Sequence, residues 1–297
     1  MNNVAIGFIS FQTTLEILIF FFHIRYHLHE EWKLVTYFSY FWIYQFFQVF
    51  ITYTASAFYD PGYLPRTWIS QVQNDPEYKE ELAETGEKNF CEQCIQPRPL
   101  RCHHCSDCNK CVLLYDHHCF FIDNCVGKRN FKVFFQFLWG FVVHAGVTMF
   151  IVFYNISTHD PDAFQLFTMM IGLLYFPVFS FFVIFQLFPQ VGFLFHNSTW
   201  VEDSMRDKQK EFYQKAKVKQ YYAYDHGLIQ NLKERLGQNP IQWFLPTPNT
   251  DNPYKSRYNP SYVPIHKLHV SLIDNFDENS PLLKKYARKR ENAQDMV

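Results

Sequence analysis

The sequence has almost no net charge. Its 27 Lys and Arg residues are balanced by 28 Asp and Glu residues, which gives a formal net charge of -1 over 297 residues. Chains that bind nucleic acids usually carry an excess of basic residues gathered on one face. We therefore expect no nucleic-acid partner.

Four long stretches have almost no charged side chains. They are residues 4–24, 34–58, 133–154 and 163–196, and Glu16 is the single Asp, Glu, Lys or Arg within them. A helix of about 20 such residues can cross the roughly 30 Å hydrocarbon core of a membrane. The first stretch also lacks the basic start and the small-residue cleavage site of a secretory signal. We therefore predict four transmembrane helices.

The fourth stretch has an awkward length. Its 34 residues would form a helix of about 51 Å, which exceeds one crossing but scarcely allows two crossings and a turn. Pro177, Pro189 and Gly192 offer kinks. We predict one kinked span that continues along the cytosolic interface.

Basic residues avoid the loops on one side of these stretches. Of the 27 Lys and Arg residues, 9 lie between Tyr59 and Lys132 and 16 lie beyond His196, which leaves Arg25 and Lys33. Positively charged loops stay in the cytoplasm, so an even number of spans separates the two basic regions. Both termini are then expected to be cytosolic.

Two polar residues fall inside the apolar stretches. An acid at the depth of Glu16 is costly in lipid, so it should face the bundle interior or a polar cavity, with a hydrogen bond to a neighbouring helix as the simplest arrangement. His144 is expected to be a packing residue with its hydrogen bonds satisfied and not a metal ligand.

Cysteine is absent outside one short region. All eight cysteines lie between Cys91 and Cys125, together with four of the 13 histidines. The Cys-x2-Cys spacing occurs at Cys91/Cys94, Cys105/Cys108 and Cys108/Cys111, among others. This spacing lets one turn present two thiolates to a tetrahedral zinc ion. A disulfide framework is the alternative, but it is typical of secreted domains, whereas the flanking apolar stretches indicate an integral membrane chain.

Two zinc sites of three Cys and one His each would leave two cysteines and two histidines over. One of these pairs can lie in the run Asp116-His117-His118-Cys119. An imidazole oriented by a carboxylate can lower the pKa of a neighbouring thiol from about 8.5, or accept its proton. The run could thus supply a nucleophile, a base and an orienting group. Alternatively, His117 and Cys119 are further zinc ligands or buried polar residues.

The whole array resembles the cysteine-rich domain of DHHC-type protein S-acyltransferases, integral membrane enzymes that palmitoylate cysteines. The matching pattern is Cys91-x2-Cys94, His104-Cys105-x2-Cys108-x2-Cys111, Asp116-His117-His118-Cys119, Cys125 and Asn130, preceded by Asp60-Pro61-Gly62. The resemblance implies one zinc ion on Cys91, Cys94, His104 and Cys111, and a second on Cys105, Cys108, His118 and Cys125. It also implies that Cys119 is the acylated nucleophile, His117 its base and Asp116 the group that orients the base, and it leaves Cys102 as a free thiol.

We accordingly predict a membrane all-α protein, with four transmembrane helices and a cytosolic two-zinc cysteine-rich domain between helices 2 and 3. The expected parts are helices 1 and 2 (1–62), a linker and the zinc domain (63–130), helices 3 and 4 (131–196), a cytosolic C-terminal domain that packs on the zinc domain (197–264) and a disordered tail (265–297).

The C-terminal domain departs from the family pattern. Ser198 replaces the first Thr of the Thr-Thr-x-Glu motif and Glu202 comes one place late, which calls the hydrogen bonds of that motif into question. Asn231 and Gly237 match residues that recur in the family.

The zinc domain departs from the family pattern as well. Phe120-Phe121 replace the Pro-Trp that commonly follows the catalytic Cys, and Asp123 replaces a frequent Asn.

The resemblance implies transfer of a long-chain fatty acyl group, such as palmitoyl, from acyl-CoA to protein cysteine thiols through an S-acyl enzyme on Cys119. The acyl tail is expected in a pocket between the four helices. The CoA phosphates need cations, and the candidates that are not zinc ligands are Arg98, Arg101, His103, Lys128 and Arg129. Ordinary surface charge is the alternative explanation for these residues.

The expected cofactors are two structural zinc ions, and four protein ligands on each leave no position for a hydrolytic water. The expected partners are fatty acyl-CoA, cytosolic or membrane-associated protein substrates, and membrane lipid. We expect a multi-pass membrane protein of the Golgi or the endoplasmic reticulum. Two other functions fit the zinc motifs: a non-catalytic zinc-finger membrane adaptor, and a membrane thiol oxidoreductase that uses the Cys-x2-Cys pairs.

Overall fold

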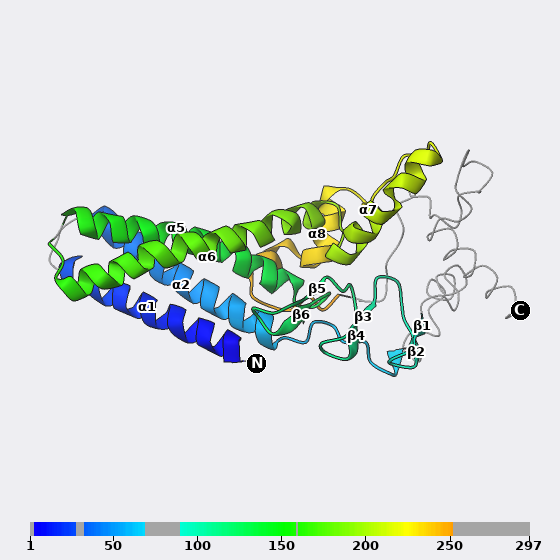
Figure 1. The fold of residues 1–297 in the computed structure, drawn as a ribbon, viewed down its shortest axis with the longest axis horizontal. Helices are drawn as coiled ribbons and strands as arrows, with labels where there is room; N and C mark the ends of the chain where they lie inside the picture. Colours follow the sequence, from blue (N-terminus) through cyan, green and yellow to red (C-terminus); the bar gives the residue numbers. More distant parts are fainter. Residues whose placement is uncertain (1–2, 28–32, 69–89, 159, 252–297) are drawn as a thin grey trace, which may run out of the picture. The chain divides into compact units, whose positions relative to one another are not determined.

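The computed structural model describes residues 3–27, 33–68, 90–158 and 160–251, and these are mostly helical. The helices are α1 (Asn3–His27), α2 (Lys33–Phe58), α5 (Phe131–Thr158), α6 (Ala163–Phe195), α7 (Trp200–Lys215), α8 (Leu228–Leu236) and the short 3-10 helix η2 (Pro240–Phe244). The strands form three antiparallel hairpins: β1 (Phe90–Cys91) with β2 (Gln96–Pro97), β3 (His103–Cys105) with β4 (Lys110–Val112), and β5 (His117–Cys119) with β6 (Asn124–Val126) (Figure 1).

The described residues form two compact units. The first contains those up to Gly62, then His117–Gly192 and Arg235–Asp251. The second contains those from Tyr63 to Asp116 and from Phe193 to Glu234. Hairpin β5–β6 therefore belongs to the same unit as the long helices, whereas the other two hairpins belong to the second unit.

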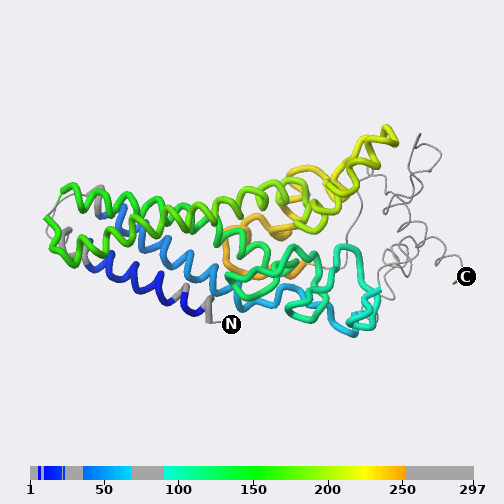
Figure 2. The backbone as a smooth tube through the Cα atoms, in the orientation of Figure 1, coloured from blue at the N-terminus to red at the C-terminus, as the bar shows by residue number. Residues whose placement is uncertain are grey.

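The first unit is a bundle of long helices that run side by side (Figure 2). Trp42 of α2 donates from Nε1 to Thr148 Oγ1 of α5 at 2.8 Å. The rings of Phe141 on α5 and Phe179 on α6 lie 5.8 Å apart. Gly140 lies where α2 and α5 approach closely, because a Cβ at this position would overlap the Gln48 side chain.

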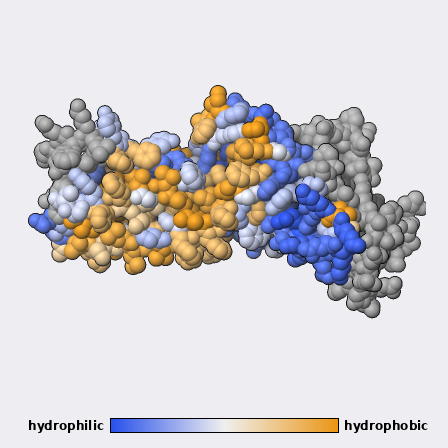
Figure 3. All heavy atoms as spheres, turned by 90° about the horizontal axis from the view of Figure 1, so that it is seen from above, coloured by the Kyte–Doolittle hydropathy of each residue, from blue (hydrophilic) through white to orange (hydrophobic). Residues whose placement is uncertain are grey.

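The outer surface of the bundle is apolar. Phe185 and Phe188 on α6 are 73% and 82% exposed, and the surface over the long helices is mostly hydrophobic (Figure 3). By length and composition, two of the described helices, α5 and α6, could cross a membrane. A soluble chain would hide such surface, so this is a membrane protein. The crossing of all four helices stays a prediction.

Glu16 and His144 lie where the sequence predicts. Glu16 Oε1 is 2.7 Å from His144 Nε2, so a hydrogen bond joins α1 to α5. Both residues are buried. The acid faces the interior with a hydrogen bond to another helix, as expected. The histidine is a packing residue, but its hydrogen bonds are only partly satisfied, because its buried Nδ1 atom has no partner among the described residues.

The fourth apolar stretch forms one element. Helix α6 is continuous over 33 residues, with Pro177 and Pro189 inside it. Two shorter helices joined by a turn are therefore excluded, as predicted. The kink and the course along the interface stay predictions.

The second unit has a small apolar core around hairpins β1–β2 and β3–β4. This core comprises Leu64, Trp68, Cys91, Cys102, Cys111 and Leu113, with Cys94 packed against it. Half of these residues are cysteines, and the Leu64 N–H donates to the Cys111 carbonyl at 2.9 Å. A core of this size provides little folding free energy by itself, so bound metal is expected to supply much of the rest.

Candidate functional site

Four side chains of the second unit converge on one point. Cys91 ends β1, Cys94 follows in the turn, and His104 and Cys111 lie directly opposite each other on β3 and β4. His104 Nδ1 lies 3.5 Å from Cys91 Sγ, 3.3 Å from Cys94 Sγ and 3.9 Å from Cys111 Sγ. All four ligand atoms lie within 4.8 Å of one another.

These distances fit a single tetrahedral zinc ion. With zinc–sulfur bonds of about 2.3 Å and zinc–nitrogen bonds of about 2.0 Å, ligand atoms should be about 3.5 to 3.8 Å apart. The Cys94 and Cys111 sulfurs are 3.6 Å apart, in agreement. All eight cysteines are in the described part of the chain and none forms a disulfide there. The structure thus favours metal ligation over a disulfide framework.

The other predicted ligands form two half-sites. In the second unit, the Cys108 N–H donates to Cys105 Sγ at 3.5 Å. In the first unit, His118 and Cys125 are cross-strand partners on β5 and β6, with Nδ1 and Sγ 3.7 Å apart. The separation of His118 Nδ1 and Cys125 Sγ is the one expected of two ligands on one ion.

The alternation of side chains along a strand separates two roles within hairpin β5–β6. Successive residues of a strand point to opposite faces, so His117 and Cys119 share one face of β5 and His118 lies on the other. The face of His118 is the one that meets Cys125. His118 could therefore bind a metal ion while its sequence neighbour His117 lies on the face of Cys119.

Asn124 fixes this hairpin to the end of α2. It lies opposite Cys119 in the strand register. Its side-chain amide donates to the carbonyls of Ser56, Ala57 and Tyr59, at 3.1, 3.2 and 2.9 Å. The last carbonyls of a helix have no partner within the helix, so Asn124 caps α2 with one side chain.

Two further side chains hold the same hairpin. Tyr53 of α2 donates from its hydroxyl to the Phe121 carbonyl at 2.7 Å. Asn130 Nδ2 donates to the Cys125 carbonyl at 2.7 Å, and Asn130 Oδ1 accepts from Gly127 N–H at 2.9 Å. Cys119, which is 8% exposed, is thus held at the end of a long apolar helix. Sequence reasoning missed Asn124 and Tyr53, because nothing in local spacing links them to α2.

The surroundings of Asp116 and His117 differ. The His117 ring meets the Phe134 ring of α5 at 5.6 Å in a T-shaped contact. Asp116 is 1% exposed and accepts from the Trp200 N–H, at the start of α7, at 3.4 Å. A carboxylate at a helix N-terminus is stabilised by the helix dipole.

Helix α7 begins with a complete capping box. Thr199 Oγ1 accepts from the Glu202 N–H at 3.3 Å, and Glu202 Oε2 accepts from the Thr199 N–H at 3.0 Å. Glu202 therefore makes defined hydrogen bonds, although it stands one place later than the Glu of the family motif. The spacing Thr-x-x-Glu is itself a helix-start signal that could have predicted this.

Glu202 also binds Arg101. The guanidinium donates from Nε to Glu202 Oε1 at 2.6 Å and from Nη2 to Glu202 Oε2 at 2.9 Å. Nη1 and Nη2 donate to the side chain and carbonyl of Asn197 at 3.1 and 2.7 Å. The Arg101 side chain is 2% exposed, so its donors are used inside the protein. This argues against the predicted contact between Arg101 and CoA phosphates.

The other predicted cations differ in how deeply they are buried. Burial lowers the pKa of His103 to about 4, with the Arg98 and Arg101 charges contributing, and Glu202 opposes this only in part. His103 is therefore neutral near pH 7 and offers no charge to a phosphate. Lys128 is 8% exposed, whereas Arg129 is 42% exposed and pairs with Asp60 at 3.2 Å. Arg98 is half-buried.

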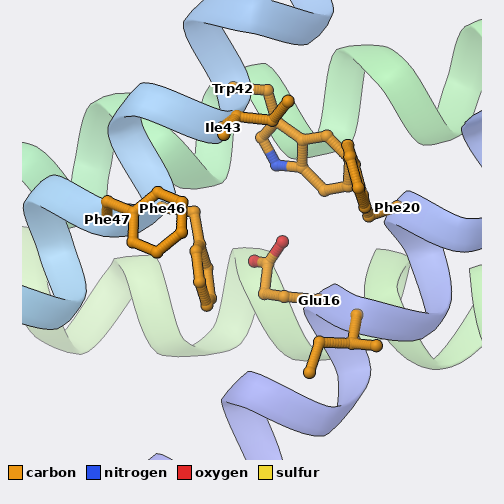
Figure 4. Close-up of a pocket in the computed structure, with 7 residues that line it drawn as sticks. Glu16, Phe20, Trp42, Ile43, Phe46 and Phe47 are labelled. Carbon is orange, nitrogen blue, oxygen red and sulfur yellow. The ribbon is translucent and has the colours of Figure 1, made fainter.

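An apolar groove lies between α1 and α2. Its cavity is about 300 Å³ and is lined by Glu16, Ile17, Phe20, Trp42, Ile43, Phe46 and Phe47. The Glu16 carboxyl points into it between aromatic rings (Figure 4). The acyl pocket predicted between all four helices is not this groove, since α5 and α6 contribute no lining residue.

Residues 84–208 match the family model described as DHHC palmitoyltransferase. The chain is 30% identical over 205 residues to "Probable protein S-acyltransferase 16" of Arabidopsis thaliana, which covers 66% of this chain and 71% of that protein. It is 29% identical over 194 residues to "Probable protein S-acyltransferase 15" of the same plant, covering 63% and 74%. It is 34% identical over 123 residues to human "Palmitoyltransferase ZDHHC5", covering 38% of this chain and 17% of that protein.

Proposed function

This chain belongs to the DHHC palmitoyltransferase family, and we propose that Cys119 carries the acyl group in its reaction. The enzyme is a protein S-acyltransferase that palmitoylates cysteines. The observation that supports Cys119 most directly is the strand alternation in β5, which places it beside His117 and on the face opposite His118. Its sulfur then stays outside the metal sites and can react.

The first step is attack by the Cys119 thiolate on the thioester carbonyl of a fatty acyl-CoA. A new carbon–sulfur bond forms, the bond to the CoA sulfur breaks, and the proton from Cys119, held by His117, passes to the leaving CoA thiolate. In the second step a protein thiol attacks the Cys119 thioester. His117 accepts its proton and returns it to Cys119. Asp116 would orient the imidazole.

Two structural zinc ions would hold this arrangement. One would be bound by Cys91, Cys94, His104 and Cys111, whose distances fit a tetrahedral ion. The two half-sites, Cys105 with Cys108 and His118 with Cys125, would share the other. Each ion would have four protein ligands, so its role is to fix the fold. Ligation of His118 would also fix the direction of β5.

The surroundings of Cys119 suit a substrate with a lipid tail and a charged head. We propose four transmembrane helices with both termini cytosolic, and a pocket among their Phe and Tyr side chains for the acyl tail. Lys128, Arg129 and Arg98 remain candidates for the CoA phosphates. Cytosolic or membrane-associated proteins in the Golgi or the endoplasmic reticulum would supply the accepting thiols.

Autoacylation of the full-length protein tests the proposal. With palmitoyl-CoA that carries a clickable tail, the wild type should acquire label that hydroxylamine removes, because hydroxylamine cleaves thioesters. Cys119→Ser should acquire none and should keep two zinc ions per chain. Equal label on both proteins would contradict the role of Cys119, and loss of zinc from Cys119→Ser would show that its sulfur is a ligand. An adaptor would show no label on either protein.

A further inference from the structure

The segment from Pro240 to Leu245 presents large apolar side chains to its surroundings. Helix η2 covers Pro240–Phe244. Ile241 is 74% exposed, Phe244 is 85% exposed and Leu245 is 47% exposed. Three such side chains within five residues form a compact apolar surface, which usually marks an interaction site.

This segment is fixed to the first turns of α5, and both belong to the first unit. Lys132 Nζ donates to the Gln242 carbonyl at 2.8 Å and to Thr247 Oγ1 at 2.9 Å. Gln136 Nε2 donates to the Trp243 carbonyl at 2.6 Å and to the Leu245 carbonyl at 3.2 Å. The uncharged run of α5 starts at residue 133. The segment therefore lies at the depth where α5 enters the membrane.

Internal hydrogen bonds satisfy several polar groups of the segment. Asn239 accepts from the Ile241 N–H through its side chain at 3.0 Å and from the Gln242 N–H through its carbonyl at 3.0 Å. The Leu245 N–H donates to the Gln242 carbonyl at 3.2 Å. Trp243 Nε1 donates to the Gly237 carbonyl at 2.6 Å. Backbone that contacts lipid must have its polar groups satisfied by protein, and these hydrogen bonds satisfy part of the backbone of the segment.

We propose that Pro240–Leu245 inserts Ile241, Phe244 and Leu245 into the interfacial layer of the membrane beside α5. Large aromatic and aliphatic side chains are favoured at this depth. Lipid would cover this apolar surface, because four hydrogen bonds from Lys132 and Gln136 hold the segment against a membrane helix. The segment would anchor residues 235–251 to the membrane independently of catalysis.

Photo-crosslinking of the full-length protein in nanodiscs with radiolabelled phosphatidylcholine tests this. Phe244→p-benzoylphenylalanine places a photoreactive group at the apolar surface. Gln238→p-benzoylphenylalanine is the matched control, since Gln238 is exposed and lies two residues before the segment, outside the apolar surface. We expect about tenfold more lipid label at position 244 than at position 238, because only the former lies in the interfacial layer.

Label at position 244 equal to that at position 238 would overturn the proposal. So would a crosslink from position 244 to a second copy of the chain, or to another protein, in place of lipid. Zinc content shows whether each variant is folded. If Phe244→p-benzoylphenylalanine does not fold, Ile241→p-benzoylphenylalanine decides in the same way.

Discussion

The buried ion pair between Arg101 and Glu202 gives the sharpest prediction. Two hydrogen bonds join the side chains, the Arg101 side chain is 2% exposed and that of Glu202 is 16% exposed. The guanidinium also lies 4.1 Å above the Tyr224 ring. We consider Glu202→Gln, which removes the negative charge and keeps a side chain that can still complete the capping box.

Loss of one partner of a buried ion pair costs about 3 to 5 kcal/mol, because the other charge stays buried without compensation. Glutamine can still accept hydrogen bonds, so we expect the lower value, about 3 kcal/mol. In a chain of this size that corresponds to a fall of about 10 °C in the melting midpoint. Arg101→Met should cost a similar amount.

The assay is the temperature at which cysteines of the purified, detergent-solubilised protein become reactive to a fluorogenic thiol reagent. The double variant Arg101→Met/Glu202→Gln removes both charges, so its midpoint should fall by much less than the sum of the two single changes. Arg206→Met is the matched control. Arg206 pairs with Asp203 at 3.0 Å but is 32% exposed, so its loss should cost less than about 1 kcal/mol.

Two results would refute this reasoning. One is additive behaviour of the two single changes, which would mean that the side chains do not interact. The other is an Arg101→Met variant with an unchanged midpoint and a raised KM for palmitoyl-CoA. In that case the guanidinium would serve the co-substrate, as the sequence predicts.

Three further changes test other parts of the site. Asn124→Ala removes an amide that donates to two α2 carbonyls and to the Tyr59 carbonyl just after α2, each bond worth about 1 kcal/mol. It should lower autoacylation about tenfold, and label equal to wild type would contradict its role. Cys94→Ser should reduce the metal content measured by mass spectrometry from two zinc ions per chain to one, and an unchanged content would show that Cys94 is no ligand. Although burial alone would raise the pKa of Asp225, hydrogen bonds from Asn231 and His196 hold it below the usual value. Its ionised form therefore stabilises the fold above about pH 4, and this contribution disappears as the pH falls further. Below pH 4 the melting midpoint of the wild type should fall more steeply with decreasing pH than that of Asp225→Asn. Parallel plots of melting midpoint against pH would contradict this.

Local spacing allowed much of the site to be predicted. The Cys-x2-Cys spacing predicted that Cys91 and Cys94 present their thiolates together, because a turn of a few residues has little freedom in where it presents its side chains. The grouping of this pair with His104 and Cys111 was implied by the resemblance to the family, and these four side chains do converge in the structure. The continuous helix α6 was predictable from the length of the apolar stretch, since 34 residues scarcely allow two crossings and a turn.

Contacts between distant segments were harder to predict. Arg101 looked like a free cation because its partner, Glu202, is about 100 residues away and buries it. The same applies to Asn124, whose amide donates to carbonyls of α2 more than 60 residues earlier in the chain. In both cases the residue type indicates a polar contact, but a single sequence does not say with which partner.

The hydrogen bond between Glu16 and His144 has a consequence for biosynthesis. The two residues are 128 positions apart in the chain, so α1 leaves the ribosome long before α5 exists. A carboxyl group without a partner is expensive in lipid. We therefore expect α1 to settle into the bilayer late, when α5 arrives with the imidazole, so that the order of integration differs from the order of translation.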